Sequence, residues 1–176
     1  MKKFLSALFL VAGMGAAFAQ GPLLDPVVVP DYERDASGQD AHRDFTIKLF
    51  EVGGGNTLFG TFSGKPLLIF YFMSTCGHCQ HAYPLVEQMA AKYKNLSLIA
   101  VASGGNTEES IEEFRASRKV HAPLFQDKSK RFNEKYGIGS VPLLVLVNSD
   151  GRYIRYRSFS DEVQRQLAEK LDKIAK

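Results

Sequence analysis

Residues 67–90 read LLIFYFMSTCGHCQHAYPLVEQMA and contain the two cysteines of this 176-residue chain, Cys76 and Cys79. The first six residues form an unbroken apolar run, which is typical of a central strand buried on both faces of a sheet. After Cys79 the apolar residues recur at intervals of three and four, which predicts an amphipathic helix. The segment therefore predicts a strand, a short loop with a Cys-Gly-His-Cys motif, and a helix.

This order places Cys76 at the first turn of the predicted helix, where free backbone N–H groups and the helix dipole favour an anion. A thiolate held there is a nucleophile that attacks disulfides. Cys79, one turn later, is expected to be more buried, to have the higher pKa, and to resolve the mixed disulfide. His78, when protonated, favours the thiolate and hence the reduced form, which points to an oxidising or isomerising role without deciding the direction.

Non-catalytic roles for the cysteine pair are less well supported by the sequence. A structural disulfide would stabilise the fold little, because so short a loop removes little entropy from the unfolded chain. Haem attachment requires a histidine directly after the second cysteine, and Gln80 stands there. Metal binding would need further ligands, for which His78, His81 and His121 are the candidates. A disulfide exchange enzyme is favoured, with no cofactor or metal expected; a metal-handling protein and a binding module with a vestigial disulfide remain alternatives.

The rest of the chain alternates predicted strands and helices. Strands are predicted over residues 45–51, 57–62, 96–102, 123–125, 143–147 and 152–157, with the first two and the last two forming hairpins. Helices are predicted from a cap at Asn106 to about Lys119, in a short segment after Asp127, and from Ser160 onward. This alternation predicts an α/β fold in which a mixed sheet is covered by helices on both faces.

Over residues 44–176 this order resembles the thioredoxin superfamily, and within it the exported TlpA/ResA-like thiol–disulfide oxidoreductases. The resemblance rests on the CGHC motif, on Pro84 in the helix after it, and on residues 139–142, Gly-Ser-Val-Pro, which are similar to the family's cis-proline loop. It implies a thioredoxin-like mixed sheet flanked by helices, with an N-terminal hairpin and a central helix–strand insertion between residues 102 and 127.

The resemblance also implies where substrates bind. In the family the cis-proline loop packs beside the cysteines and pairs with the substrate backbone, so the peptide bond between Val141 and Pro142 is expected to be cis and both residues to bind substrate. Gly77 and Thr75, next to Cys76 in the chain, complete the expected substrate-binding set. The catalytic set is Cys76, Cys79 and His78.

Three positions depart from the family pattern. Thr75 stands where the family usually has tryptophan, Phe70 where thioredoxins have a buried aspartate, and Ala82 where ResA-like proteins have a glutamate. Both carboxylates are associated with removing the proton of the second thiol. Their replacement argues against efficient reductase behaviour and adds weight to an oxidase or isomerase, with a ResA-like reductase as the alternative.

The N-terminus predicts export. Lys2 and Lys3 precede an apolar run over residues 4–14, and Ala17-Phe18-Ala19 has small residues at cleavage positions. We predict a signal peptide over residues 1–19, with an uncleaved membrane anchor as the alternative, then an extended linker or arm over residues 20–43 and a thioredoxin-like domain over 44–176. We therefore expect a periplasmic or secreted protein.

Composition limits the partners. Hydrophobic residues make up 45% and charged residues 23% of the chain, an ordinary globular balance. The formal charge is +3, and two positive charges lie in the predicted signal peptide, so no nucleic-acid-binding surface is indicated. The expected partners are exported proteins that contain thiols or disulfides, with a membrane redox partner as a further option.

Overall fold

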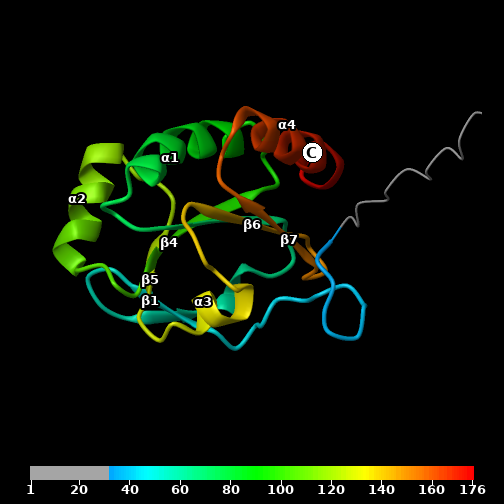
Figure 1. Ribbon diagram of the computed structural model, residues 1–176, viewed down its shortest axis with the longest axis horizontal. Helices are drawn as coiled ribbons and strands as arrows, with labels where there is room; N and C mark the ends of the chain where they lie inside the picture. The colour runs from blue at the N-terminus through cyan, green and yellow to red at the C-terminus, as the bar shows by residue number, and fades with distance from the viewer. Residues whose placement is uncertain (1–31) are drawn as a thin grey trace, which may run out of the picture.

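A seven-stranded mixed sheet organises residues 32–176, the part of the chain that the computed structural model describes (Figure 1). The strands are β1 (Lys48–Glu51), β2 (Asn56–Leu58), β3 (Leu67–Phe72), β4 (Ser97–Ser103), β5 (Leu124–Asp127), β6 (Leu143–Val147) and β7 (Tyr153–Arg157). Their order across the sheet is β2-β1-β5-β4-β3-β6-β7. Strands β3, β4 and β5 are parallel, whereas β6 runs antiparallel to β3 and β1 antiparallel to β5.

Helices cover both faces of this sheet. They are α1 (Gly77–Ala90), α2 (Glu108–Arg118), α3 (Arg131–Tyr136) and α4 (Asp161–Ile174), with a 3-10 helix, η1, over Phe59–Phe62. Helices α1, α2 and α4 pack on one face, and α3 and η1 on the other (Figure 1). All six residues of β3 are buried, and they alternate between the two cores. The predicted α/β class and the thioredoxin-like layering are therefore confirmed.

The N-terminal hairpin is present, but its second strand is shorter than the sequence predicts. Strand β2 ends at Leu58, and the chain then coils into η1. The N–H of Phe59 donates to the carbonyl of Ile47 at 2.8 Å, and the Phe59 ring is fully buried, 5.7 Å from the ring of Phe132. The 3-10 turn thus places this aromatic side chain in the core beneath the sheet.

One predicted helix start agrees with the structure, and two lie before the observed ones. Ser160 caps α4, as predicted, by accepting a hydrogen bond from the N–H of Val163. Asp127 is the last residue of β5, and α3 begins at Arg131, although the Asp127 carboxylate accepts bonds from the N–H groups of Phe132 and Asn133 in the first turn. Helix α2, however, is capped by Thr107 rather than by Asn106, whose side chain binds elsewhere.

The described part of the predicted arm, residues 32–43, packs against β7 at the edge of the sheet. The N–H of Glu33 donates to the carbonyl of Tyr153 at 2.9 Å, and the Glu33 carboxylate pairs with Arg155 at 2.9 Å. Residues 1–31, which include the predicted signal peptide and the first half of the arm, lie outside the described residues. The division of the chain at residue 44 stays a prediction. From residue 32 onward, none of the helices has the length and apolar character needed to cross a membrane.

One close backbone contact gives a test of the fold. A Cβ at Gly104 would lie 2.5 Å from the carbonyl oxygen of Asp127, whereas one at Gly105 would meet nothing within 4 Å. We expect Gly104→Ala to lower the free energy of unfolding by about 1–3 kcal/mol, the usual cost of overpacking, and Gly105→Ala to leave it nearly unchanged. Urea unfolding of both variants measures this. Equal stabilities would contradict the contact.

Candidate active site

Cys76 lies where the loop after β3 enters α1. It is the N-cap residue of the helix, in an extended conformation, and its sulfur accepts a hydrogen bond from the N–H of Cys79 at 3.4 Å. The side chain is partly exposed, and its sulfur lies 3.9 Å from the carbonyl oxygen of Val141. A sulfur at this position receives helix N–H groups, which stabilise an anion.

Cys79 has a contrasting environment. It faces the core shared by α1, α2 and α4 and is fully buried, and both cysteines are free thiols in the structure. Burial, followed by a hydrogen bond with Cys76, raises the pKa of Cys79 to about 12, and a backbone hydrogen bond from Met73 offsets part of the rise. The geometry thus pairs an accessible sulfur with one that holds its proton tightly.

The surroundings of Cys79 are apolar at the positions where family members carry acids. Phe70 is fully buried, with its ring 5.4 Å from the ring of Tyr83, and Ala82 is also buried. Glu87 lies eight residues beyond Cys79, about 12 Å along the helix axis. Its carboxylate accepts bonds from the Tyr83 hydroxyl and from the N–H of His121. Glu87 therefore does not substitute for the missing acids.

The loop before β6 lies beside Cys76. The peptide bond between Val141 and Pro142 is cis, as the resemblance implies. Pro142 is buried, Val141 is half-buried, and the N–H of Ser158 donates to the carbonyl of Pro142 at 3.2 Å. The carbonyl of Val141 thus faces the site from a loop that is itself held by the segment after β7.

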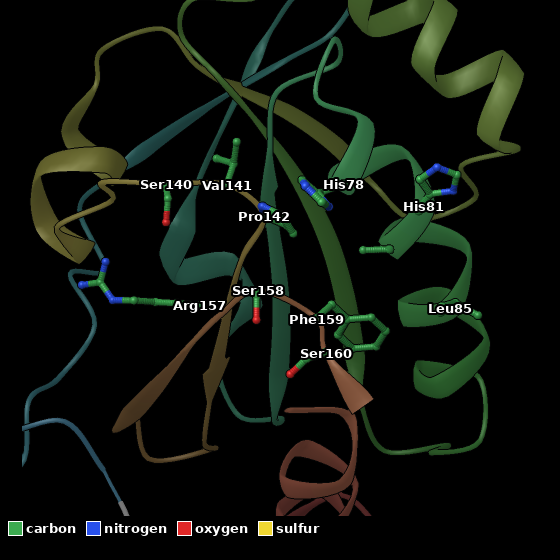
Figure 2. Close-up of a pocket in the computed structure, with 11 residues that line it drawn as sticks. His78, His81, Leu85, Ser140, Val141, Pro142, Arg157, Ser158, Phe159 and Ser160 are labelled. Atoms are coloured by element: carbon green, nitrogen blue, oxygen red, sulfur yellow. The ribbon is translucent and has the colours of Figure 1, made fainter. Parts of the chain in front are cut away.

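A groove of about 470 Å³ runs along this loop, and we call it the cis-proline groove. Its lining includes His78 and Leu85 from α1, Val141 and Pro142 from the loop, and Phe159 from the segment before α4 (Figure 2). Leu85 belongs to the apolar series that predicts the helix after Cys79, and such a series is expected to face the core, but Leu85 is 46% exposed. Periodicity alone could not reveal this, because an apolar residue that lines a groove has the same spacing as one in the core.

The remaining predicted site residues are distributed around the cysteines. Thr75 is exposed on the other side of Cys76, where it lines a polar cavity of about 430 Å³ between α1 and α2 with Gln80 and Arg118. Gly77 is exposed, and a Cβ there would meet nothing within 4 Å. The structure therefore brings His78, Val141 and Pro142 to one side of Cys76 and leaves Thr75 on the other.

The candidate metal ligands are separated. His78 and His81 line the cis-proline groove, whereas His121 lies next to Glu87, near the other end of α1. Within residues 32–176, no three side chains of His, Cys, Asp or Glu are grouped so that they could hold a metal ion. The described residues therefore give the metal-handling alternative no support.

Comparison with known families agrees with this architecture. A family model described as thioredoxin-like matches residues 64–153, just over half of the chain, from the lead-in to β3 to the start of β7. The chain belongs to the thioredoxin-like family. The match includes both cysteines and the cis-proline.

Individual relatives are distant. The thiol–disulfide oxidoreductase ResA of Bacillus thuringiensis (strain Al Hakam) is 23% identical over 112 residues, 63% of this chain and 64% of that protein. The chain thus spans just under two thirds of the length of the ResA proteins of Bacillus thuringiensis that it matches.

Solved structures share the fold. A secreted disulfide oxidoreductase of Mycobacterium tuberculosis, described as homologous to E. coli DsbE, has a TM-score of 0.64 at 16% identity, covering 74% of this chain and 97% of that one. An exposed lipoprotein thioredoxin of Streptococcus pneumoniae has a TM-score of 0.59 at 20% identity, covering 71% and 98%.

The unequal environments of the two thiols predict unequal reactivity. Burial raises the pKa of Cys79 and so lowers its thiolate fraction near neutral pH below that of an exposed cysteine. In the reduced native protein we expect iodoacetamide to modify Cys76 well before Cys79, because Cys79 is buried and burial raises its pKa. Peptide mass spectrometry after timed alkylation measures this, with protein in denaturant as the control, where both thiols should react alike. Faster modification of Cys79 in the native protein would contradict the site.

Proposed function

We propose that this protein is a thiol–disulfide oxidoreductase in which Cys76 is the nucleophile and Cys79 the resolving cysteine. The observation that carries the proposal is the geometry of the first turn of α1, where an accessible sulfur accepts the N–H of its buried partner at 3.4 Å. Nucleophilic attack requires an accessible thiolate, and a second thiol one turn away can release the product.

In the first step the Cys76 thiolate attacks a disulfide of the client protein. A bond forms between Cys76 and one client sulfur, the client disulfide breaks, and the other client sulfur leaves as a thiolate. Cys79 then loses its proton and attacks the Cys76 sulfur, which forms the Cys76–Cys79 disulfide and releases the second client thiol. In reverse, a client thiolate attacks Cys76 of the disulfide form, and the client is oxidised.

We propose that clients bind in the cis-proline groove. The Val141 carbonyl lies 3.9 Å from the Cys76 sulfur, so a client segment that reaches this sulfur passes next to the loop. An extended segment has free backbone N–H groups that can pair with such a carbonyl. The exposed Leu85 and the half-buried Phe159 offer apolar contact to side chains of the same segment.

We propose further that the clients are exported proteins. The N-terminal sequence has the pattern of a signal peptide. Two structural neighbours are described as a secreted oxidoreductase and as an exposed lipoprotein, which agrees with this location. Outside the cytosol disulfides persist, so client disulfides are available for exchange.

A trapping experiment tests the roles of the two cysteines. In Cys79→Ser the mixed disulfide between Cys76 and a client cannot be resolved, so client proteins should accumulate covalently attached to Cys76. Cys76→Ser should give no adducts and no exchange. Expression in the native compartment, followed by acid quenching and non-reducing electrophoresis, measures both outcomes. Adducts on Cys79 in Cys76→Ser, or their absence from both variants, would overturn the assignment.

For the direction of exchange we propose disulfide donation or isomerisation. The N–H of Cys79 favours a Cys76 thiolate, and stabilising the reduced form makes a pair more oxidising. We expect equilibrium with glutathione to place the pair closer to protein disulfide isomerase, at about −180 mV, than to thioredoxin, at about −270 mV. A value on the thioredoxin side would identify a reductase instead.

A further inference from the structure

Ser74, two residues before Cys76, is held by side chains from two helices and from the loop before α2. Its N–H and its hydroxyl both donate to Oδ1 of Asn106, at 2.8 and 2.7 Å, and its hydroxyl oxygen lies 2.9 Å from Oγ of Ser110. Its carbonyl accepts a bond from the Gln80 amide at 2.9 Å. Ser74 is only 5% exposed, so these partners replace water at each of its polar groups.

These bonds act on the backbone that positions Cys76. The peptide group between Met73 and Ser74 donates its N–H to Asn106 and accepts, at its carbonyl, the N–H of Cys76 at 3.1 Å. The next peptide group is held through the Ser74 carbonyl by Gln80. Two successive peptide groups before Cys76 are therefore fixed by side chains outside the loop.

The side chains that hold Ser74 are themselves anchored. The amide nitrogen of Asn106 donates to the carbonyl of Ser103, at the end of β4, at 2.7 Å. Gln126, buried in β5, donates to the carbonyl of Asn106 at 2.6 Å. Arg118, the last residue of α2, donates to Oε1 of Gln80 at 2.9 Å. We call Ser74, Gln80, Asn106 and Arg118 the Ser74 brace.

We propose that the Ser74 brace sets the redox equilibrium of the cysteine pair, with Asn106 and Gln80 as positioning residues that act through the loop. The proposal rests on the proposed function. The Cys76 sulfur accepts the Cys79 N–H only while the loop holds Cys76 in its extended N-cap conformation. In the disulfide form a covalent bond fixes the two sulfurs, so that form depends less on the brace. Loosening the loop therefore lowers the stability of the dithiol form more than that of the disulfide form.

The test compares Asn106→Ala with Thr107→Ala. Thr107 is the neighbouring N-cap of α2, and its side chain accepts the N–H of Ser110 without contacting Ser74. Asn106→Ala removes three side-chain hydrogen bonds and Thr107→Ala removes one, so the loss of unfolding free energy is measured for each variant in urea and the redox shift is compared with it. Only Asn106→Ala should shift the glutathione equilibrium, by about fivefold toward the disulfide, equivalent to about 20 mV. Gln80→Met, which keeps the volume and removes the donor, should shift it in the same direction.

The outcomes separate this inference from the proposed function. A shift in Asn106→Ala and Gln80→Met, with Thr107→Ala unchanged, supports the brace. Equal shifts in all three variants would show that the redox equilibrium follows the overall stability of the protein, and would overturn the proposal. Wild-type exchange with no shift in either brace variant overturns the brace and leaves the proposed function intact. A wild-type protein that does not exchange with glutathione overturns both.

Discussion

The hydrogen bond from the Cys79 N–H to the Cys76 sulfur is the contact on which the site depends. It exists because the chain changes from strand to helix just before the two cysteines, so that Cys76 is the cap and Cys79 lies inside the first turn. A separation of three residues is close to one helical turn, which places both sulfurs on the same side of α1 but at different depths. The same turn therefore produces an accessible sulfur and a buried one, and neither environment requires a charged side chain.

The position of the cis-proline loop follows from the sheet. Strand β6 runs antiparallel to β3, with Leu143 opposite Tyr71. The start of β6 is therefore at the same edge of the sheet as the end of β3, and residues 141–142 lie next to the loop that leads to Cys76. Because β4 and β5 run parallel to β3, their carboxyl ends reach this edge as well, which brings Asn106 and Gln126 to the other side of the loop. The topology of the sheet thus places the cis-proline groove and the Ser74 brace on the two sides of the loop that leads to Cys76.

The features that depend only on adjacent residues were predicted from the sequence. The apolar run of β3, the helix after Cys79 and the cap at Ser160 each follow from a few adjacent residues. Asn106 and Thr107 are both good caps, and the choice between them depends on Ser74, which is 32 residues away from Asn106 in sequence. Residues 32–43 have the composition of a linker, yet Glu33 and Arg43 bond to the backbone around β7. These tertiary contacts leave no periodic signal in the sequence.

The apolar surroundings of Cys79 are expected to affect the rate of thiol–disulfide exchange more than its direction. Phe70 packs against Tyr83 and Phe72, where an aspartate would require several partners to be buried at low cost. The packing that strengthens the core also raises the pKa of Cys79, so Cys79 forms a thiolate with difficulty. In the proposed mechanism that thiolate is the attacking group when the pair reduces a client and the leaving group when the pair oxidises one. Since both directions pass through the same transition state, the lack of a carboxylate at Phe70 and Ala82 is expected to slow both directions, so these two replacements do not by themselves argue against a reductase, contrary to the expectation from the sequence. We propose that the direction is set where the two redox forms differ in stability, at the cap of α1, where the Cys76 sulfur accepts the N–H of Cys79 in the dithiol form.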